Sequence, residues 1–301
     1  MCGDRSSLED GAGVSGPSWS TRCTRRAALR LIAAGTGAAL LHAAQAAESG
    51  ANTRLEPARA PSSLDTTAAV ELAGRQRALS QRMTKGYLMI GQGVSPDFGR
   101  TILDESRRQF EAQLGVLRAY QPNAMVGEAL SSLEAQWKRY QVLLDAAPSR
   151  HGAEAMYDAN EALMQSAHRT TLAYERVSGA PTDHLINLAG RQRMLSQRMA
   201  KFFFYRTWGI RDGAAEMELD NARAHFTAVF IQLRASPLAS PAVRIKVEQL
   251  EREWEPYKAA LLASRDPAGM RPYGMPVATL SEKILAGTED LVALMIREIR
   301  A

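Results

Sequence analysis

The stretch LAGRQRALSQRM, residues 72–83, returns as LAGRQRMLSQRM at residues 188–199. Eleven of the twelve positions are identical, at an offset of 116 residues. Further matches extend on the C-terminal side of both copies: Lys85 with Lys201, Asp104 with Asp220 and Phe110 with Phe226 at the same offset, then Trp137 with Trp254, Tyr140 with Tyr257 and Leu163 with Leu280 at an offset of 117. Because the matches are spread over so long a segment, the sequence indicates a duplicated module rather than one short motif used twice.

Each copy has the pattern of helices joined by short loops. Apolar residues recur at helical spacing, and clusters of Gly, Ser and Pro interrupt them, so we expect helices over about 66–91, 97–120, 125–146 and 153–177 in the first copy. No segment shows the sustained alternation of a strand. The pattern predicts an all-α fold of two tandem antiparallel four-helix-bundle modules, residues 64–178 and 182–301, packed as a pseudo-twofold internal dimer.

The N-terminal region is typical of an exported protein. Arg25 and Arg26 precede a short apolar run rich in Ala and Gly, which ends at the small-x-small pattern Ala44-Gln45-Ala46. Residues 1–46 therefore read as a signal peptide. The arginine pair and the weak hydrophobicity favour the twin-arginine route, with an ordinary Sec signal as the alternative. We expect an exported protein, with residues 47–63 as a flexible leader.

The composition of the mature protein argues against disulfide bonds, nucleic-acid binding and membrane-spanning segments. Both cysteines, Cys2 and Cys23, precede the predicted cleavage site, so no disulfide is expected after export. Removal of residues 1–46 leaves 32 basic and 29 acidic residues, a balance of about +3, which is too mild to indicate a nucleic-acid partner. No later segment is apolar and long enough to span a membrane once the signal is cleaved.

The repeated motif has two faces when it is placed on a helical wheel. Leu72, Leu79 and Met83 form a stripe that faces the core of their own module. Arg77 points away from that stripe, on a face of small or neutral residues. The members of this face are Ala73, Gly74 and Ser80 around Arg77 in the first copy, and Ala189, Gly190 and Ser196 around Arg193 in the second. Two matching small-residue faces predict that the two motif helices pack on each other.

This packing brings Arg77 and Arg193 together at a partly dry interface. Two like charges there repel each other unless an anion lies between them. A planar guanidinium suits a small oxyanion, so we expect an anion clamp between the two modules. The remaining polar residues of the motif are expected to support the clamp or, for the arginines, to pair with acids on neighbouring helices: Arg75, Arg82, Arg191, Arg198, Ser80 and Ser196.

LAGRQRMLSQRM resembles the signature of the PilJ-type module, the N-terminal domain of type IV pili methyl-accepting chemotaxis transducers. It is also similar to the P-box helix of bacterial nitrate and nitrite sensor kinases. The resemblance implies a periplasmic four-helix sensor bundle. In those nitrate sensors one nitrate lies between the P-box helices of two subunits, gripped by an arginine from each. Alignment of the motif places these roles on Arg77 and Arg193, with backbone contacts at Ala73-Gly74 and Ala189-Gly190.

Two departures from this resemblance bear on function. Gln76 and Gln192 stand where the P-box residue is usually apolar. The related sensors are anchored by a transmembrane helix, and we expect none in this chain. We therefore expect a sensor or binding protein for nitrate or nitrite that passes its signal to a membrane-bound signalling or transport partner. The alternative is a ligand-free helical adaptor, which predicts an exposed apolar patch around Phe202–Trp208.

The sequence offers little that points to catalysis. The four histidines after the signal, His151, His168, His184 and His225, include no pair at i and i+4, and no Glu-x-x-His motif occurs. Neither a Ser/His/Asp order nor a phosphate-cradling glycine loop is visible. We expect no enzyme, no cofactor and no metal site.

Overall fold

The computed structural model describes residues 64–301, so the predicted signal peptide and leader lie outside the described residues. All regular elements in this range are helical, which confirms the predicted all-α class. They are α2 (Thr66–Gly91), α3 (Pro96–Arg118), α4 (Ala124–Asp145), α5 (Arg150–Ser178), α6 (Pro181–Thr207), α7 (Asp212–Ala235), α8 (Pro241–Leu261), the short α9 (Pro267–Met270), the 3-10 turn η1 (Arg271–Tyr273) and α10 (Gly274–Arg300).

The helices begin where side chains can satisfy their free backbone N–H groups. Asp65 accepts a hydrogen bond from the Ala68 N–H at 2.7 Å, and Asn123 accepts one from Val126 at 3.0 Å. Ser149 does the same for Gly152, at 3.1 Å, and this cap explains why α5 starts three residues before the predicted 153. Caps of this kind typically stabilise a helix by about 1 kcal/mol.

The duplication is visible in the backbone of the turns. Gly93 in the α2–α3 turn and Gly209 in the α6–α7 turn have φ values of 70° and 66°. Two residues later, Ser95 and Arg211 have φ values of 43° and 48°, a region that non-glycine residues seldom adopt. Equivalent residues, 116 positions apart, thus make the same unusual turn.

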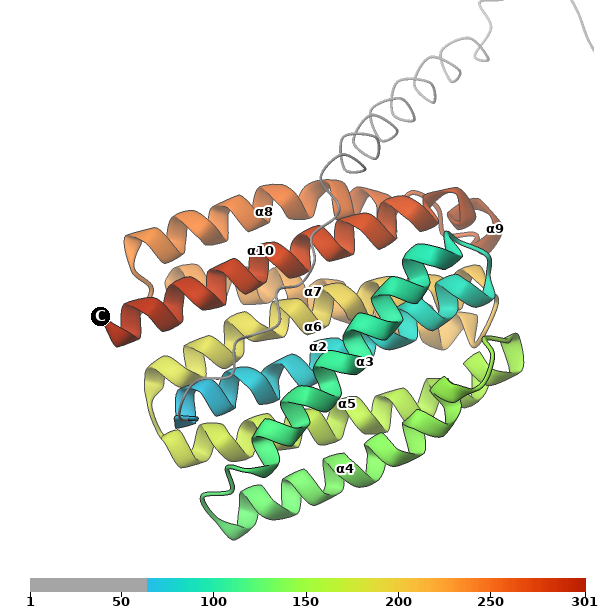
Figure 1. Cartoon of the computed structure of the whole chain (residues 1–301). Helices are drawn as coiled ribbons and strands as arrows, with labels where there is room; N and C mark the ends of the chain where they lie inside the picture. Colours follow the sequence, from blue (N-terminus) through green and yellow to red (C-terminus); the bar gives the residue numbers. More distant parts are fainter. Residues whose placement is uncertain (1–63) are drawn as a thin grey trace, which may run out of the picture. The chain divides into compact units, whose positions relative to one another are not determined.

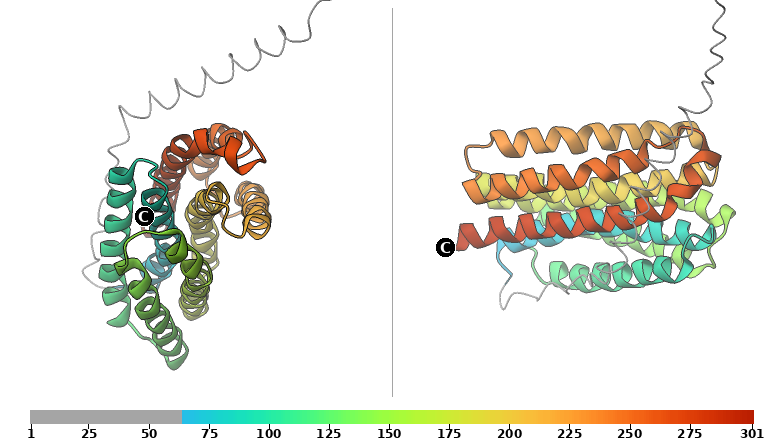
Figure 2. Two further views of the ribbon diagram at one scale, coloured as in Figure 1. Left: turned by 90° about the vertical axis from the view of Figure 1, so that its right-hand side faces the viewer. Right: turned by 90° about the horizontal axis from the view of Figure 1, so that it is seen from above.

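Each half of the chain forms a four-helix bundle around its own motif helix (Figures 1 and 2). In the first half α2 packs against α3 and α5, and α4 packs against α5. In the second half α6 packs against α7 and α10, and α8 packs against α10. The cores correspond, because Phe110 stacks on Trp137 with ring centroids 4.3 Å apart and Phe226 packs on Trp254 at 4.7 Å.

The two bundles join through α2 and α6, which lie side by side and parallel (Figure 1). Near their beginnings, Thr67 Oγ1 donates to Asp183 Oδ1 at 2.9 Å. At their far ends, Thr207 Oγ1 donates to Gln92 Oε1 at 2.8 Å. Residues about 116 positions apart therefore face each other along the whole interface, which confirms the predicted pseudo-twofold internal dimer.

One detail of the predicted repeat is wrong. Arg82 and Lys85 on α2 pair with Glu282 on α10, whereas Arg198 and Lys201 on α6 pair with Glu161 on α5. These equivalent contacts relate α5 to α10 by an offset of 121 residues, not 117. Leu163 accordingly corresponds to Ile284, and both are fully buried, while Leu280 is only partly buried. The shift arises because extra residues form α9 and η1 before α10 begins.

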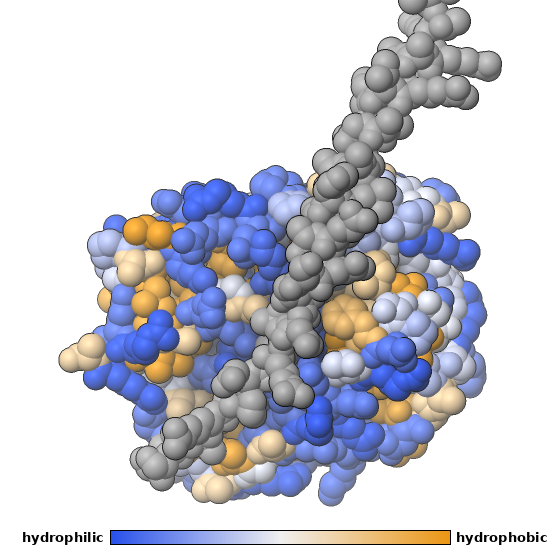
Figure 3. Space-filling model, turned by 45° about the horizontal axis from the view of Figure 1, so that its top comes forward, coloured by the Kyte–Doolittle hydropathy of each residue, from blue (hydrophilic) through white to orange (hydrophobic). Residues whose placement is uncertain are grey.

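The predicted apolar patch at Phe202–Trp208 is also absent from the described surface. Phe202, Phe203, Phe204 and Tyr205 are all 0% exposed, because α6 is central and has neighbours on every side. Figure 3 shows apolar groups scattered among hydrophilic side chains on the face it presents. None of the described helices combines the length and the apolar character needed to cross a membrane.

Candidate functional site

Arg77 of α2 and Arg193 of α6 converge over the two glycines of the repeated motif. A methyl group on Gly74 would lie 3.2 Å from Arg77 Nη2 and 3.9 Å from Arg193 Nη2. A methyl group on Gly190 would lie 3.1 Å from Arg193 Nη2 and 3.8 Å from Arg77 Nη2. Both arginines are only 1% exposed, and the adjacent Ala73 and Ala189 are fully buried. The small residues thus leave the room that two guanidinium groups need between the helices.

The partners of Arg77 are all neutral. Its Nε donates to the Gly74 carbonyl at 3.3 Å, and its Nη2 donates to Asn187 Oδ1 at 2.8 Å. Its Nη1 lies 3.3 Å from His168 Nδ1 on α5. Within residues 64–301 no carboxylate comes within ion-pair distance of this guanidinium. Arg77 is therefore a buried cation without a counter-charge.

This environment makes the Arg77 guanidinium easier to deprotonate. Burial, followed by the positive charges of Arg191 and Arg193, lowers the pKa of Arg77 to about 9. A buried charge of this kind is costly unless an opposite charge neutralises it. The positive charge of Arg77 is therefore not compensated by a direct ion pair within residues 64–301.

Arg193 differs from Arg77, because it has a carboxylate partner. Its Nη1 donates to Glu71 Oε1 at 2.7 Å, and the same oxygen accepts from Arg75 Nε at 2.5 Å. Burial alone would raise the pKa of Glu71, but the charges of Arg75 and Arg193 outweigh burial and lower it. Arg75 also pairs with Glu289 at 3.1 Å.

One edge of the Arg193 guanidinium stays open. Its buried Nε has no hydrogen-bond partner in the described part of the chain, and its Nη2 takes part in no hydrogen bond there either. Nε and Nη2 form one side of the guanidinium fork, the side that commonly binds two oxygens of one anion. A buried donor that is left unsatisfied, as Nε is, is uncommon in a folded protein.

The other polar residues of the motif have structural partners. Arg82 pairs with Glu282 and Glu105, and Arg198 pairs with Glu161 and Glu218, as the ion-pair interpretation predicts. Arg191 is exposed. Ser80 and Ser196 donate to the carbonyls of Arg77 and Arg193, each at 2.8 Å. Gln76 and Gln192 donate to the carbonyls of Phe110 on α3 and Phe226 on α7, so they tie the motif helices to their own modules.

Four residues near the arginine pair were not anticipated from the sequence: Glu71, Asn187, His168 and Glu175. Glu71 and Asn187 occupy equivalent positions at the offset of 116, directly before the motif, so the repeat itself could have drawn attention to them. Asn187 in turn donates to Glu175 of α5. His168 and Glu175 carry no sequence signal, because only the packing of α5 against α2 and α6 brings them near.

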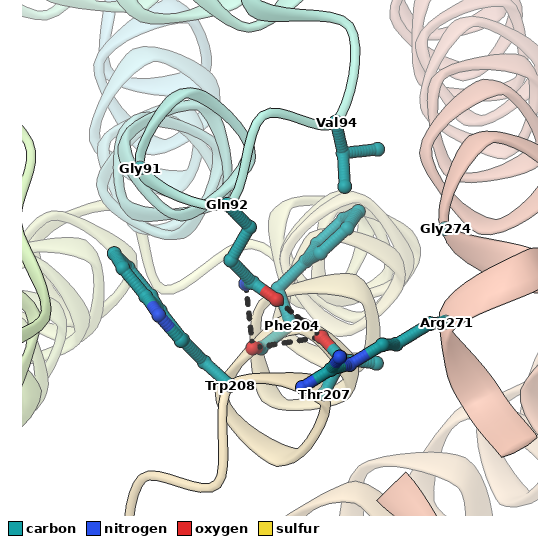
Figure 4. A pocket seen from close by; sticks show the side chains of 8 residues that line it. All are labelled: Gly91, Gln92, Val94, Phe204, Thr207, Trp208, Arg271 and Gly274. Carbon is teal, nitrogen blue, oxygen red and sulfur yellow. Dashed lines mark hydrogen bonds between the residues drawn. The ribbon is translucent and has the colours of Figure 1, made fainter. Parts of the chain in front are cut away.

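A separate cavity of about 380 Å³ lies where α2 and α6 end and α10 begins (Figure 4). Phe204, Trp208 and Val94 form its apolar walls, and Arg271 extends towards it. Gly91 at its edge follows Arg77 by nearly four helical turns, roughly 20 Å, so this cavity does not belong to the arginine pair. In residues 64–301 no three His, Asp or Glu side chains are grouped closely enough to hold a metal ion.

Comparison with known proteins identifies the modules. The family model described as type IV pili methyl-accepting chemotaxis transducer N-term, PilJ, matches residues 61–171 and again residues 181–271. No curated protein and no solved structure matches the chain. The two matched segments cover more than half of the sequence and contain both copies of the repeated motif. The chain therefore belongs to the PilJ family, whose sensor-type domain it carries as two tandem copies.

Proposed function

We propose that this chain is an exported sensor protein that binds one small oxyanion, nitrate or nitrite, between α2 and α6. The PilJ domain is a sensory domain of chemotaxis transducers, and the family is not one of enzymes. The observation that carries the proposal is the burial of Arg77 without a carboxylate partner, opposite a second buried arginine. An anion in this place would supply the missing negative charge.

The donors around the pair suit a planar oxyanion. Two of its oxygens can accept from Nε and Nη2 of Arg193, the open edge of that guanidinium. Arg77 Nη2 reaches the same point above Gly74 and Gly190 and can donate to a remaining oxygen. Apart from the two arginines, the ligand would contact mainly backbone, because the residues beside it are small. These are Ala73, Gly74, Ala189 and Gly190. The close packing restricts the site to ions of a few atoms.

The closed packing also suggests how binding becomes a signal. Arg77, Arg193 and the small residues around them are almost fully buried, so a ligand enters only if α2 and α6 shift relative to each other. Buried ion pairs join these helices to the opposite module, through Arg82 with Glu282 on α10 and Arg198 with Glu161 on α5. A shift of the motif helices would therefore move α5 and α10. A ligand that prefers the shifted arrangement drives this change.

The cellular setting follows from the sequence. In this proposal residues 1–46 direct export to the periplasm, residues 47–63 form a leader, and two modules, 64–178 and 182–301, make up the working protein. A membrane-bound signalling or transport protein would then read the conformation.

Isothermal titration of residues 47–301 with nitrate, nitrite, sulfate and chloride tests the proposal. We expect saturable nitrate or nitrite binding with one site per chain. Arg77→Ala and Arg193→Ala should each abolish it, while Arg139→Ala, a change at an exposed arginine of α4, should not. Binding that survives both buried changes would contradict the site. If none of the oxyanions binds to the folded protein, the ligand-free adaptor becomes the better account.

A further inference from the structure

The two halves of the arginine pair differ at one position that decides the local charge. Glu71, next to Arg193, corresponds at the offset of 116 residues to Asn187, next to Arg77. The residues four positions later are the same, Arg75 and Arg191. The duplicated frame is thus retained, while one carboxylate has an amide as its counterpart.

The charges at the centre can be counted from the contacts. Arg77 and Arg193 contribute two positive charges and Glu71 contributes one negative charge, while Arg75 is matched by its own pair with Glu289. At the rim, Arg191 and Glu175 carry opposite charges and offset each other; both influence Arg77. The buried centre therefore has an excess of one positive charge.

We infer that Glu71 makes the site selective for singly charged oxyanions and excludes doubly charged ones such as sulfate. This inference rests on the proposed function of the arginine pair and specifies its ligand class. A monoanion brings the buried centre to neutrality. A dianion leaves one uncompensated negative charge beside the Glu71 carboxylate, in a dry interface where charge repulsion is weakly screened. The net charge of the buried centre can thus discriminate between anions of similar size.

Asn187 completes the arrangement from the other side. Its Oδ1 accepts from Arg77 Nη2 at 2.8 Å, so it holds this guanidinium in place without neutralising it. Its Nδ2 donates to Glu175, which fixes the orientation of the amide. Arg77 therefore keeps a full charge for the ligand, while Arg193 shares its charge with Glu71 and offers its open edge.

Four variants of the mature chain separate charge from shape. Glu71→Gln removes the carboxylate and keeps the side-chain length, and Glu71→Asn makes both halves alike. Asn187→Glu adds a second carboxylate, which Arg191 can pair with at a spacing of four residues, as Arg75 pairs with Glu71. The double change Glu71→Asn/Asn187→Glu moves the carboxylate to the other half and leaves the total charge unchanged.

The measurement is isothermal titration with sodium nitrate and sodium sulfate at constant ionic strength, with circular dichroism to confirm folding. We expect wild type to bind nitrate at least about a hundredfold more tightly than sulfate. Either single change at Glu71 should strengthen sulfate binding by about tenfold or more, and Asn187→Glu should weaken nitrate binding by a similar factor. The double change should restore the preference of wild type.

The outcomes distinguish this inference from the function on which it rests. If wild type binds no oxyanion, the proposed function fails, and the inference fails with it. If wild type binds nitrate but Glu71→Gln leaves the ratio of nitrate to sulfate affinity unchanged, only the inference is overturned. A folded double variant that binds nitrate no better than Asn187→Glu also overturns it, because the count of charges would then not be what matters.

Discussion

Replacement of Arg77 by Met should make the ligand-free protein more stable. Burial and the neighbouring positive charges lower the pKa of Arg77 to about 9, well below its ordinary value, so the fold destabilises the charged guanidinium by roughly 5 kcal/mol. Both pKa values lie above neutral pH, so the group is protonated in the folded and unfolded states and the whole penalty is present at pH 7. Methionine removes the charge but leaves the buried side-chain oxygen of Asn187 without its donor, which costs about 1–3 kcal/mol. The net expectation is a gain of about 2 kcal/mol or more.

The assay is urea unfolding at pH 7 in a buffer whose only anion is chloride, followed by far-UV circular dichroism. Arg193→Met is the matched control, because it removes an equally buried guanidinium whose charge is paired with Glu71. That change should lower the free energy of unfolding by about 2 kcal/mol or more, since it leaves a buried carboxylate with one partner fewer. The two equivalent arginines are thus expected to change stability in opposite directions.

Nitrate should then narrow the difference in stability between wild type and Arg77→Met. At a concentration a hundredfold above its dissociation constant, a ligand that binds only the folded state stabilises it by about 2.7 kcal/mol. Wild type should gain this amount and Arg77→Met should gain none. If Arg77→Met is less stable than wild type in chloride buffer, the guanidinium stabilises the fold, and its role as an uncompensated cation is refuted.

Three further changes test other parts of the structure. Gly86→Ala should destabilise the protein by about 1–3 kcal/mol in a thermal melt, because the added methyl would lie 2.7 Å from the backbone oxygen of Gly99, which cannot rotate away; an unchanged melt would mean that α2 and α3 are less closely packed. Glu282→Gln should cost about 3 kcal/mol or more at pH 7, because the buried Lys85 loses its carboxylate and the buried Arg82 keeps only Glu105. The pKa of Glu282 is lowered to about 2, so the difference between wild type and this variant should shrink as pH falls from 4.5 towards 2, and a constant difference would contradict the pairing. His168→Gln should make stability less sensitive to pH between 6.5 and 4: burial and the charge of Arg77 lower the pKa of the imidazole to about 4, so the unfolded chain takes up this proton first and wild type loses stability as pH falls; parallel curves for the two proteins would refute this reading.

Much of the fold follows from local features of the sequence. The helices of the first module begin and end within a few residues of their predicted limits, because Pro, Gly and capping side chains act over one helical turn. The meeting of α2 with α6 also follows from the motif, since a face of small residues on both copies has no other use in a bundle. The same helical wheel also predicts that Arg77 lies at the interface between α2 and α6.

The contacts that set the charge of the site depend on geometry between helices. Glu71 has an obvious local partner four residues away in Arg75, and nothing in the sequence says that it also reaches Arg193 on another helix. The complete burial of α6 also depends on its neighbours rather than on its own sequence. The aromatic run Phe202–Tyr205 resembles a half-exposed patch by itself, but it is enclosed because α6 contacts α2, α7 and α10 together. The spacing of residues along one helix does not predict which other helices will cover it.

Duplication within one chain makes possible a site that a symmetric dimer of identical modules cannot form. Any residue of a homodimer occurs in both halves, so a carboxylate at the position of Glu71 would be accompanied by a second one, and an amide at the position of Asn187 by a second amide. The first arrangement leaves two arginines neutralised, and the second leaves two positive charges facing each other. A fused pair, unlike a homodimer, can keep one carboxylate and one amide, and so hold a single excess positive charge between two buried arginines. The selectivity that we infer for Glu71 would therefore depend on the sequence difference that fusion permits between the two copies.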